Sequence, residues 1–183
     1  MRHPSLRAPS FALVVAITAL TGGCQTPQQL TAPPAPATPP APKFADGIVV
    51  LKGQRLLELM HEGKPFETFP IALGDHSVGT KHQLGDGRTP EGVYAVDWRT
   101  LHTKWSRELH ISYPDAKDRA RAAAAHVNPG GGIFIHGMPA DYGPYDPPLW
   151  IKDWTEGCIA VGNAAIVKIW DAVPDGTPID IQP

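Results

Sequence analysis

The sequence predicts a mainly β domain with two short α-helices. Short apolar or alternating runs recur from residue 48 onward, compact turn sequences separate them, and only two segments carry helical patterning. About 140 residues, 44–183, follow a proline-rich stretch, which is enough for one domain with a sizeable core. We therefore expect the chain to consist of an N-terminal leader, a linker and one folded domain.

A meander of three strands is expected to open this domain. Compact hairpin sequences, Lys52-Gly53-Gln54 and Glu62-Gly63-Lys64, divide the region into apolar or alternating runs. The three predicted strands cover residues 48–51, 55–60 and 65–73. Two more strands are predicted at residues 92–98 and 108–113. The first half of the domain is thus predicted to be almost entirely β.

The first helix signal follows these strands. Asp115 is a suitable N-cap for an alanine- and arginine-rich helix, and the helix should end near His126 because Pro129 and three glycines come next. A short buried strand is then predicted at residues 133–135, and His136 lies at its end. This places an imidazole at the edge of the predicted core.

A second helix and a closing strand complete the domain. Asn163 can cap this helix. Four apolar residues then share one face and dock the helix to the sheet: Ile166, Ile169, Trp170 and Val173. The last strand is predicted at residues 177–181.

Residues 1–23 are predicted to be a signal peptide. Arg2 and Arg7 supply a basic start, residues 11–20 an apolar core, and Thr21-Gly22-Gly23 a small-residue cleavage site before Cys24. The ten-residue apolar core is too short to span a bilayer, which needs roughly 20 residues. The chain is therefore expected to be exported, to the periplasm.

The sequence around Cys24 resembles a bacterial lipobox, which implies cleavage before Cys24 and acylation of its thiol. In a host with two membranes, Gln25 favours sorting to the outer membrane. Residues 26–42 hold seven prolines among seventeen residues, so we expect residues 24–43 to form an extended tether. At about 3.1 Å per residue it reaches on the order of 50 Å from a membrane anchor.

The chain holds two cysteines, and Cys24 is expected to be lipidated or removed, so Cys158 is predicted to be an unpaired thiol. Histidine can activate a thiol, and His136 is the candidate partner. On this hypothesis the pKa of the thiol should be depressed. Two alternatives stay open: Cys158 is a small buried hydrophobe, or it forms a disulfide with Cys24.

Other ligand classes have weaker support. Eight histidines are scattered without a close ligand pair, and a zinc site of His110, His136 and Cys158 is the metal alternative. A net charge of −2 at pH 7 gives no case for nucleic acid. We expect no cofactor.

A loop and a turn flank the thiol. Residues 138–153 hold four prolines together with Tyr142, Tyr145 and Trp150, so this loop is predicted to cover a site. The turn Glu156-Gly157-Cys158 would let backbone amides converge on a developing oxyanion. Both features are consistent with acyl transfer.

Four segments in this order resemble the YkuD-type L,D-transpeptidases. They are residues 87–94 (GRTPEGVY), 111–114 (ISYP), 135–137 (IHG) and 157–159 (GCI). The resemblance covers nearly all of residues 44–183 and implies a β-sandwich-like catalytic domain that acts on peptidoglycan stem peptides without metal or nucleotide.

The resemblance also implies residue roles. Cys158 would be the nucleophile and His136 the base, and the carbonyl of Gly137 would orient the imidazole. Arg88, Tyr113 and Gly157 are the candidate substrate-binding residues, Arg88 because it could bind a substrate carboxylate.

The chain departs from the family motif Ser-His-Gly-Cys-hydrophobic-Arg at Thr155, Glu156 and Ala160. We expect Glu156 to face solvent or the acceptor side. These departures make the chain more similar to the YafK-type branch, which includes a hydrolase that releases protein from peptidoglycan. Three functions follow: a transpeptidase that forms a thioester, releases D-Ala and passes the acyl group to an amine; such a hydrolase; or a catalytically silent wall-binding lipoprotein.

Overall fold

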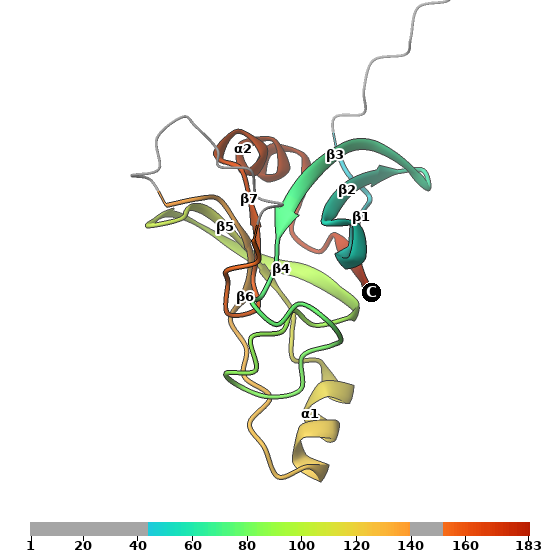
Figure 1. Cartoon of the computed structure of the whole chain (residues 1–183). Helices are drawn as coiled ribbons and strands as arrows, with labels where there is room; N and C mark the ends of the chain where they lie inside the picture. Colours follow the sequence, from blue (N-terminus) through green and yellow to red (C-terminus); the bar gives the residue numbers. More distant parts are fainter. Residues whose placement is uncertain (1–43, 140–151) are drawn as a thin grey trace, which may run out of the picture. The chain divides into compact units, whose positions relative to one another are not determined.

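The strands close into a barrel (Figure 1). Their order around it is β1-β2-β3-β7-β6-β5-β4-β8, and the pairing of β8 with β1 closes the ring. The described residues form eight strands: β1 (Gly47–Leu51), β2 (Leu56–His61), β3 (Lys64–Ala72), β4 (Gly92–Thr103), β5 (Ser106–Ile111), β6 (Ile133–His136), β7 (Ile159–Val161) and β8 (Pro178–Gln182).

This computed structural model describes residues 44–139 and 152–183. The predicted signal peptide, Cys24 and the linker lie outside the described residues, as does most of the predicted covering loop with Tyr142, Tyr145 and Trp150. Among the described helices, none has the length and apolar character needed to cross a membrane.

Alternating burial explains how the strands enclose the core. Ile48 and Val50 of β1 point inward and their neighbours are less buried, as expected for a strand with one face on the core. Neighbouring strands are antiparallel except β1 with β8 and β6 with β7. The core is built mainly of Ile, Leu and Val side chains from all parts of the barrel.

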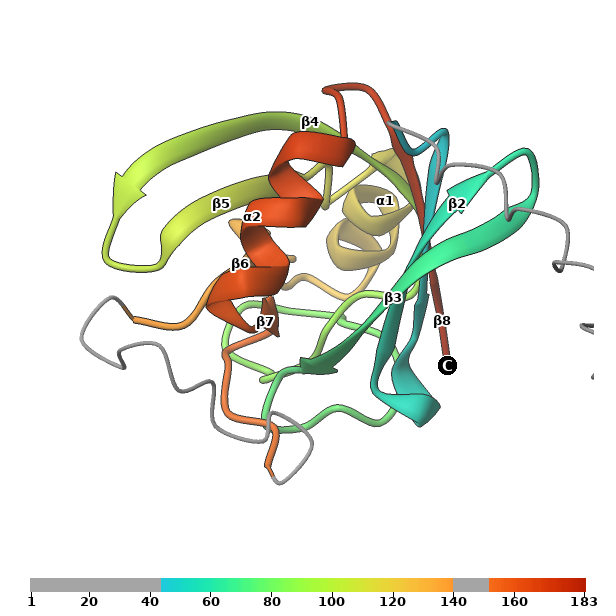
Figure 2. The ribbon, with the colours of Figure 1, turned by 90° about the horizontal axis from the view of Figure 1, so that it is seen from above.

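Two helices lie at opposite ends of the barrel (Figures 1 and 2). α1 (Ala116–Ala124) begins with a capping box, in which Asp115 and Asp118 each accept the other's backbone N–H. α2 (Asn163–Ala172) buries Ile166 and Ile169 in the main core. The predicted class, mainly β with two short helices, is confirmed.

Residues 52–54 form a 3-10 turn, η1 (Lys52–Gln54), that joins β1 to β2 as an antiparallel hairpin with Leu51 paired to Leu56, so the predicted hairpin is confirmed. Two other local features differ from the prediction. The three-residue strand β7 was not predicted, because its residues are all buried and show no alternation. The cap of α2 is Gly162, whereas the Oδ1 of Asn163 accepts the N–H of Met138 at 3.0 Å. A tertiary hydrogen bond thus replaces the expected local one.

Candidate active site

The parallel pairing of β6 with β7 brings Cys158 to His136. Ile135 pairs with Ile159, and both are fully buried on the core side. Cys158 precedes Ile159 and His136 follows Ile135, so both side chains leave the opposite face of the sheet. They line one cavity of about 480 Å³. Two residues 22 positions apart in the sequence are therefore brought into one site by the barrel.

The imidazole of His136 is held in one tautomer. Its Nδ1 lies 2.7 Å from the carbonyl oxygen of Gly137. A carbonyl oxygen can only accept a hydrogen bond, so Nδ1 carries the proton and Nε2 is left as an acceptor. This is the arrangement that the resemblance implied for Gly137.

Two tryptophans pack around this imidazole. The ring of Trp105 lies 4.8 Å from the His136 ring, centroid to centroid, and Trp154 lies edge-on at 5.8 Å. Together they leave His136 only 3% exposed. Trp105 comes from the turn between β4 and β5, and Trp154 from the segment before β7. Sequence analysis missed both residues, because nothing in their local pattern marks them as neighbours of a histidine.

Burial determines the resting protonation of the pair. It lowers the pKa of His136, and the charge of Lys104 acts in the same direction, whereas the hydrogen bond with Gly137 opposes them. Burial also raises the pKa of the Cys158 thiol, against the hydrogen bond from the Phe134 backbone. The expected depression of the thiol pKa is therefore wrong: burial shifts the pKa values of both groups in the direction that favours their neutral forms.

This assignment predicts how alkylation of Cys158 depends on pH. With a raised thiol pKa, the rate with iodoacetamide should keep rising above pH 9 without a plateau near neutrality, because the thiolate is the reactive form. The rate is measured by intact-protein mass, with Cys158→Ala as the control. A plateau between pH 5 and 8 would instead indicate a resting thiolate–imidazolium pair, contrary to the prediction.

The hydroxyl of Thr155 stabilises the turn that carries Cys158. It donates to the carbonyl oxygen of Cys158 at 2.8 Å and accepts the N–H of Gly157 at 3.1 Å. The Gly157 amide is thus occupied, so it does not join the predicted convergence of amides on an oxyanion. Gly157 contributes backbone shape instead.

We expect Thr155→Val to destabilise this turn. Losing two partly buried hydrogen bonds should lower the free energy of unfolding by about 1–3 kcal/mol and slow acylation of Cys158. Thr155→Ser keeps the hydroxyl and is the matched control. Urea unfolding and adduct formation measure the two effects, and equal stability of the valine and serine variants would contradict the role assigned to the hydroxyl.

Two glycines let backbone segments meet next to the turn that carries Cys158. Gly157 has a φ of 129°, and a Cβ there would lie 2.6 Å from the carbonyl oxygen of Arg88. A Cβ on Gly74 would overlap the carbonyl oxygen of Gly87. The buried Thr89 adds a hydrogen bond from the N–H of Gly74 to its Oγ1 at 3.2 Å. The segment 87–90 therefore supports the nucleophile turn.

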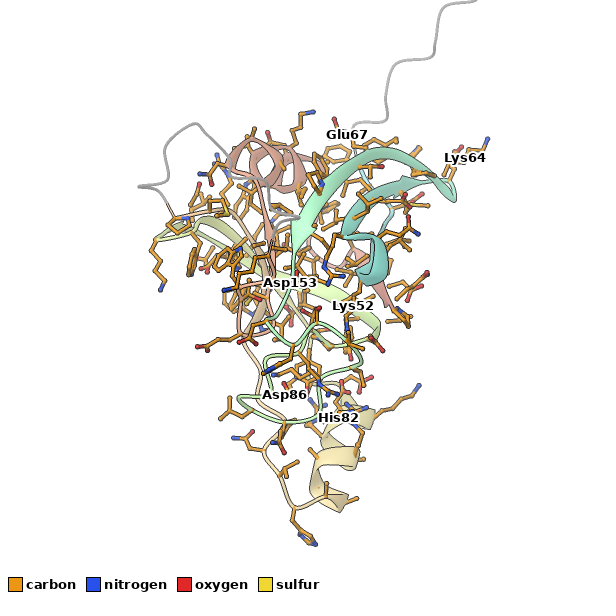
Figure 3. All side chains as sticks on the ribbon, in the orientation of Figure 1. Lys52, Lys64, Glu67, His82, Asp86 and Asp153 are labelled. Atoms are coloured by element: carbon orange, nitrogen blue, oxygen red, sulfur yellow. The ribbon has the colours of Figure 1, made fainter. Side chains whose placement is uncertain are left out.

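Buried charges connect the surrounding loops (Figure 3). The Lys52 Nζ, 2% exposed, binds Glu91 at 2.7 Å and the carbonyl oxygens of Gly79 and Thr89. Asp153, just ahead of the turn that carries Cys158, accepts from the guanidinium of Arg55 at 2.6 Å and from the Leu73 N–H at 2.9 Å. The contacts of Asp153 fix this segment to the end of η1 and to the residue that follows β3.

Two predicted substrate-binding residues lie away from this pocket. Tyr113 is 2% exposed, and its hydroxyl donates to the carbonyl oxygen of Pro129 at 3.0 Å. Arg88 lines a different cavity of about 690 Å³, together with His82 and Asp86 (Figure 3). Tyr113 is thus part of the core, and the side chains of Tyr113 and Arg88 do not line the pocket that contains Cys158.

The three residues of the zinc alternative do not form a metal site. His110 Nδ1 lies 2.6 Å from Asp97 Oδ1, and its ring stacks on Trp98. Within residues 44–139 and 152–183, no group of three His, Cys, Asp or Glu side chains could hold a metal ion. Cys158 is a free thiol.

The substituted motif positions have clear environments. Glu156 is exposed at the mouth of the pocket, as expected, and its charge contributes to the raised pKa of Cys158. Ala160 is fully buried and packs with Met138 and Trp154. The position of the family arginine is therefore taken by an apolar cluster that supports the wall of the His136 site.

Fold and site together are those of a β-barrel domain with a cysteine–histidine pocket. The family model that describes the L,D-transpeptidase catalytic domain, YkuD, matches residues 45–181. The chain belongs to this family.

Known relatives agree with this assignment. YafK of Escherichia coli (strain K12), named as an L,D-transpeptidase, is 29% identical over 104 residues, which cover 54% of this chain and 40% of YafK. The helical cell shape determining protein Pgp2 from Campylobacter jejuni is 25% identical with a TM-score of 0.58, over 74% of this chain and 46% of Pgp2. An L,D-transpeptidase from Xylanimonas cellulosilytica shares the fold, at 19% identity and a TM-score of 0.50, over 78% and 64% of the two chains. This chain thus spans less than half of YafK and Pgp2.

Proposed function

We propose that this protein is a peptidoglycan L,D-transpeptidase with Cys158 as nucleophile and His136 as base. The observation that carries the proposal is one pocket holding a free thiol and an imidazole whose Nδ1 is fixed by Gly137. That geometry leaves Nε2 to take the thiol proton. Membership of the L,D-transpeptidase family supplies the substrate class.

The proposed reaction has two halves. Nε2 of His136 accepts the thiol proton as Sγ attacks the carbonyl of the third stem residue, a diamino acid. The imidazolium then protonates the leaving amine, D-Ala departs, and a thioester remains. An acceptor amine loses a proton to His136 as it attacks the thioester, and the thiol is regenerated. Each half moves one proton through the same imidazole.

Incubating the full chain with a disaccharide tetrapeptide and reading the products by mass tests this proposal. Release of D-Ala with a 3,3-linked dimer is the expected result. Release of D-Ala without a dimer means that water, and not an amine, resolves the thioester. An unchanged substrate, with no mass gain on Cys158 from a carbapenem-type β-lactam, means a silent wall-binding protein and overturns the proposal.

We also propose that the protein is exported and anchored in the outer membrane through a lipid on Cys24. The basic start, short apolar core and small-residue cleavage site of residues 1–23 support this. Mass analysis of the mature N-terminus tests it. An acylated Cys24 followed by Gln25 is expected, whereas an unmodified soluble protein or a different first residue would refute the anchor.

A further inference from the structure

A row of side chains crosses the sheet from the nucleophile to an exposed tryptophan. In the strand register, Trp98 of β4 pairs with His110 of β5, and His110 pairs with Phe134 of β6. Cys158, one residue before the pair Ile135–Ile159, continues the row beyond Phe134. The row is therefore continuous with the catalytic pocket, which Phe134 also lines.

The rings of this row form one connected surface. Trp98 stacks on His110 with centroids 4.8 Å apart, and Phe134 stands edge-on to both rings at 5.4 and 5.0 Å. Trp98 is 46% exposed, so part of its ring is open to solvent at the end of the row. Nothing in the catalytic geometry described above uses it.

A carboxylate lies beside the exposed ring. Asp97 is about as exposed as Trp98, and one of its oxygens lies 2.6 Å from His110 Nδ1. The other oxygen of the carboxylate can still accept hydrogen bonds. A flat π face with an acceptor at its edge suits a pyranose, whose C–H bonds pack on the negative face of the ring and whose hydroxyls donate to the carboxylate.

The spacing fits the substrate. Three strand spacings separate Cys158 from Trp98, which is about 14 Å. In a stem peptide, three residues connect the attacked carbonyl to the lactyl group of an N-acetylated sugar, and in extended form they cover roughly 10 Å. The sugar ring of a stem laid along the row would therefore reach Trp98.

We propose that Trp98, with Asp97 and His110, binds the N-acetylated pyranose that carries the stem peptide. This subsite rests on the proposed function and contributes affinity, not chemistry. It makes the protein prefer stems still attached to glycan over free peptides.

Two acyl-donor substrates distinguish sugar binding at the subsite from the reaction at Cys158. One is a disaccharide tetrapeptide, and the other is the same tetrapeptide without sugar. In Trp98→Ala, kcat/KM for the disaccharide substrate should fall about tenfold through KM, the order of loss for truncating a binding tryptophan, and kcat/KM for the free peptide should not change. Leu101→Ala, which removes an equally exposed apolar side chain from the same strand, is the control and should leave both values unchanged. An equal effect on both donors, or none on the disaccharide, would overturn the subsite.

Ligand binding to the full-length Cys158→Ala variant distinguishes a failure of the proposed subsite from a failure of the proposed function. Calorimetry should show the disaccharide tetrapeptide binding more tightly than the free peptide, and adding Trp98→Ala should remove that difference. This result is expected even if wild-type protein turns over neither donor, in which case only the proposed function fails. Equal affinities for the two ligands would overturn the subsite itself.

Discussion

Replacing Cys158 with alanine is expected to abolish turnover of muropeptides, a loss of roughly 10⁴-fold or more, because no other described side chain in the pocket can form the thioester. The fold should be retained. The thiol is partly exposed, and the hydrogen bond that it donates to the carbonyl oxygen of Gly132 is long at 3.6 Å. Urea unfolding should therefore show a change in stability of under about 1 kcal/mol.

Intact-protein mass after incubation with a carbapenem compares the wild type with Cys158→Ala without the need for a peptidoglycan substrate. The strained amide of the drug mimics the attacked carbonyl, so an adduct should form on the wild type and be absent from Cys158→Ala. The exposed carboxylate of Glu156 at the pocket mouth is expected to slow this step. An equal mass gain on the alanine variant would show that Cys158 is not the activated group.

Replacing His136 has the second largest expected effect, a loss of roughly 10²–10⁴-fold in turnover, because the imidazole moves the proton in both halves of the reaction. His136→Ala would also empty the space between Trp105 and Trp154 and so lower stability. His136→Gln fills much of that space but cannot exchange a proton, so it should lose activity with less loss of stability.

The pair is also expected to act as a unit. A protein with both Cys158→Ala and His136→Gln should be no less active than Cys158→Ala alone, because the base has no function without the nucleophile. Single-turnover release of D-Ala measures each variant. Near wild-type activity in a folded His136→Gln protein would assign the base to another group.

Sequence reasoning was most successful where local patterns decide structure. The capping box at Asp115 was visible as a cap signal, and the alternating strands follow from side-chain periodicity. By contrast, β7 is only three residues long and wholly buried, so it has no periodicity to detect. Its existence depends on pairing with β6 and β3, which no local window contains.

The same limit applies to the site. That Cys158 and His136 share one pocket could be predicted because ordered motifs carry both residues. The two tryptophans that line their pocket, Trp105 and Trp154, come from separate segments, and only closure of the barrel brings their rings against the imidazole of His136. The support role of segment 87–90 was hidden for the same reason, since its carbonyl oxygens meet glycines distant in sequence.

The glycine contacts next to the turn that carries Cys158 also bear on when the protein acquires reactivity. Gly74, Gly87 and Gly157 belong to segments that meet only in the finished barrel. Before folding, Cys158 is an ordinary cysteine with no imidazole beside it. A chain that is translocated unfolded would therefore carry no competent nucleophile through the cytoplasm, where other thioester chemistry takes place. The cysteine–histidine pocket is then assembled by the same step that folds the barrel.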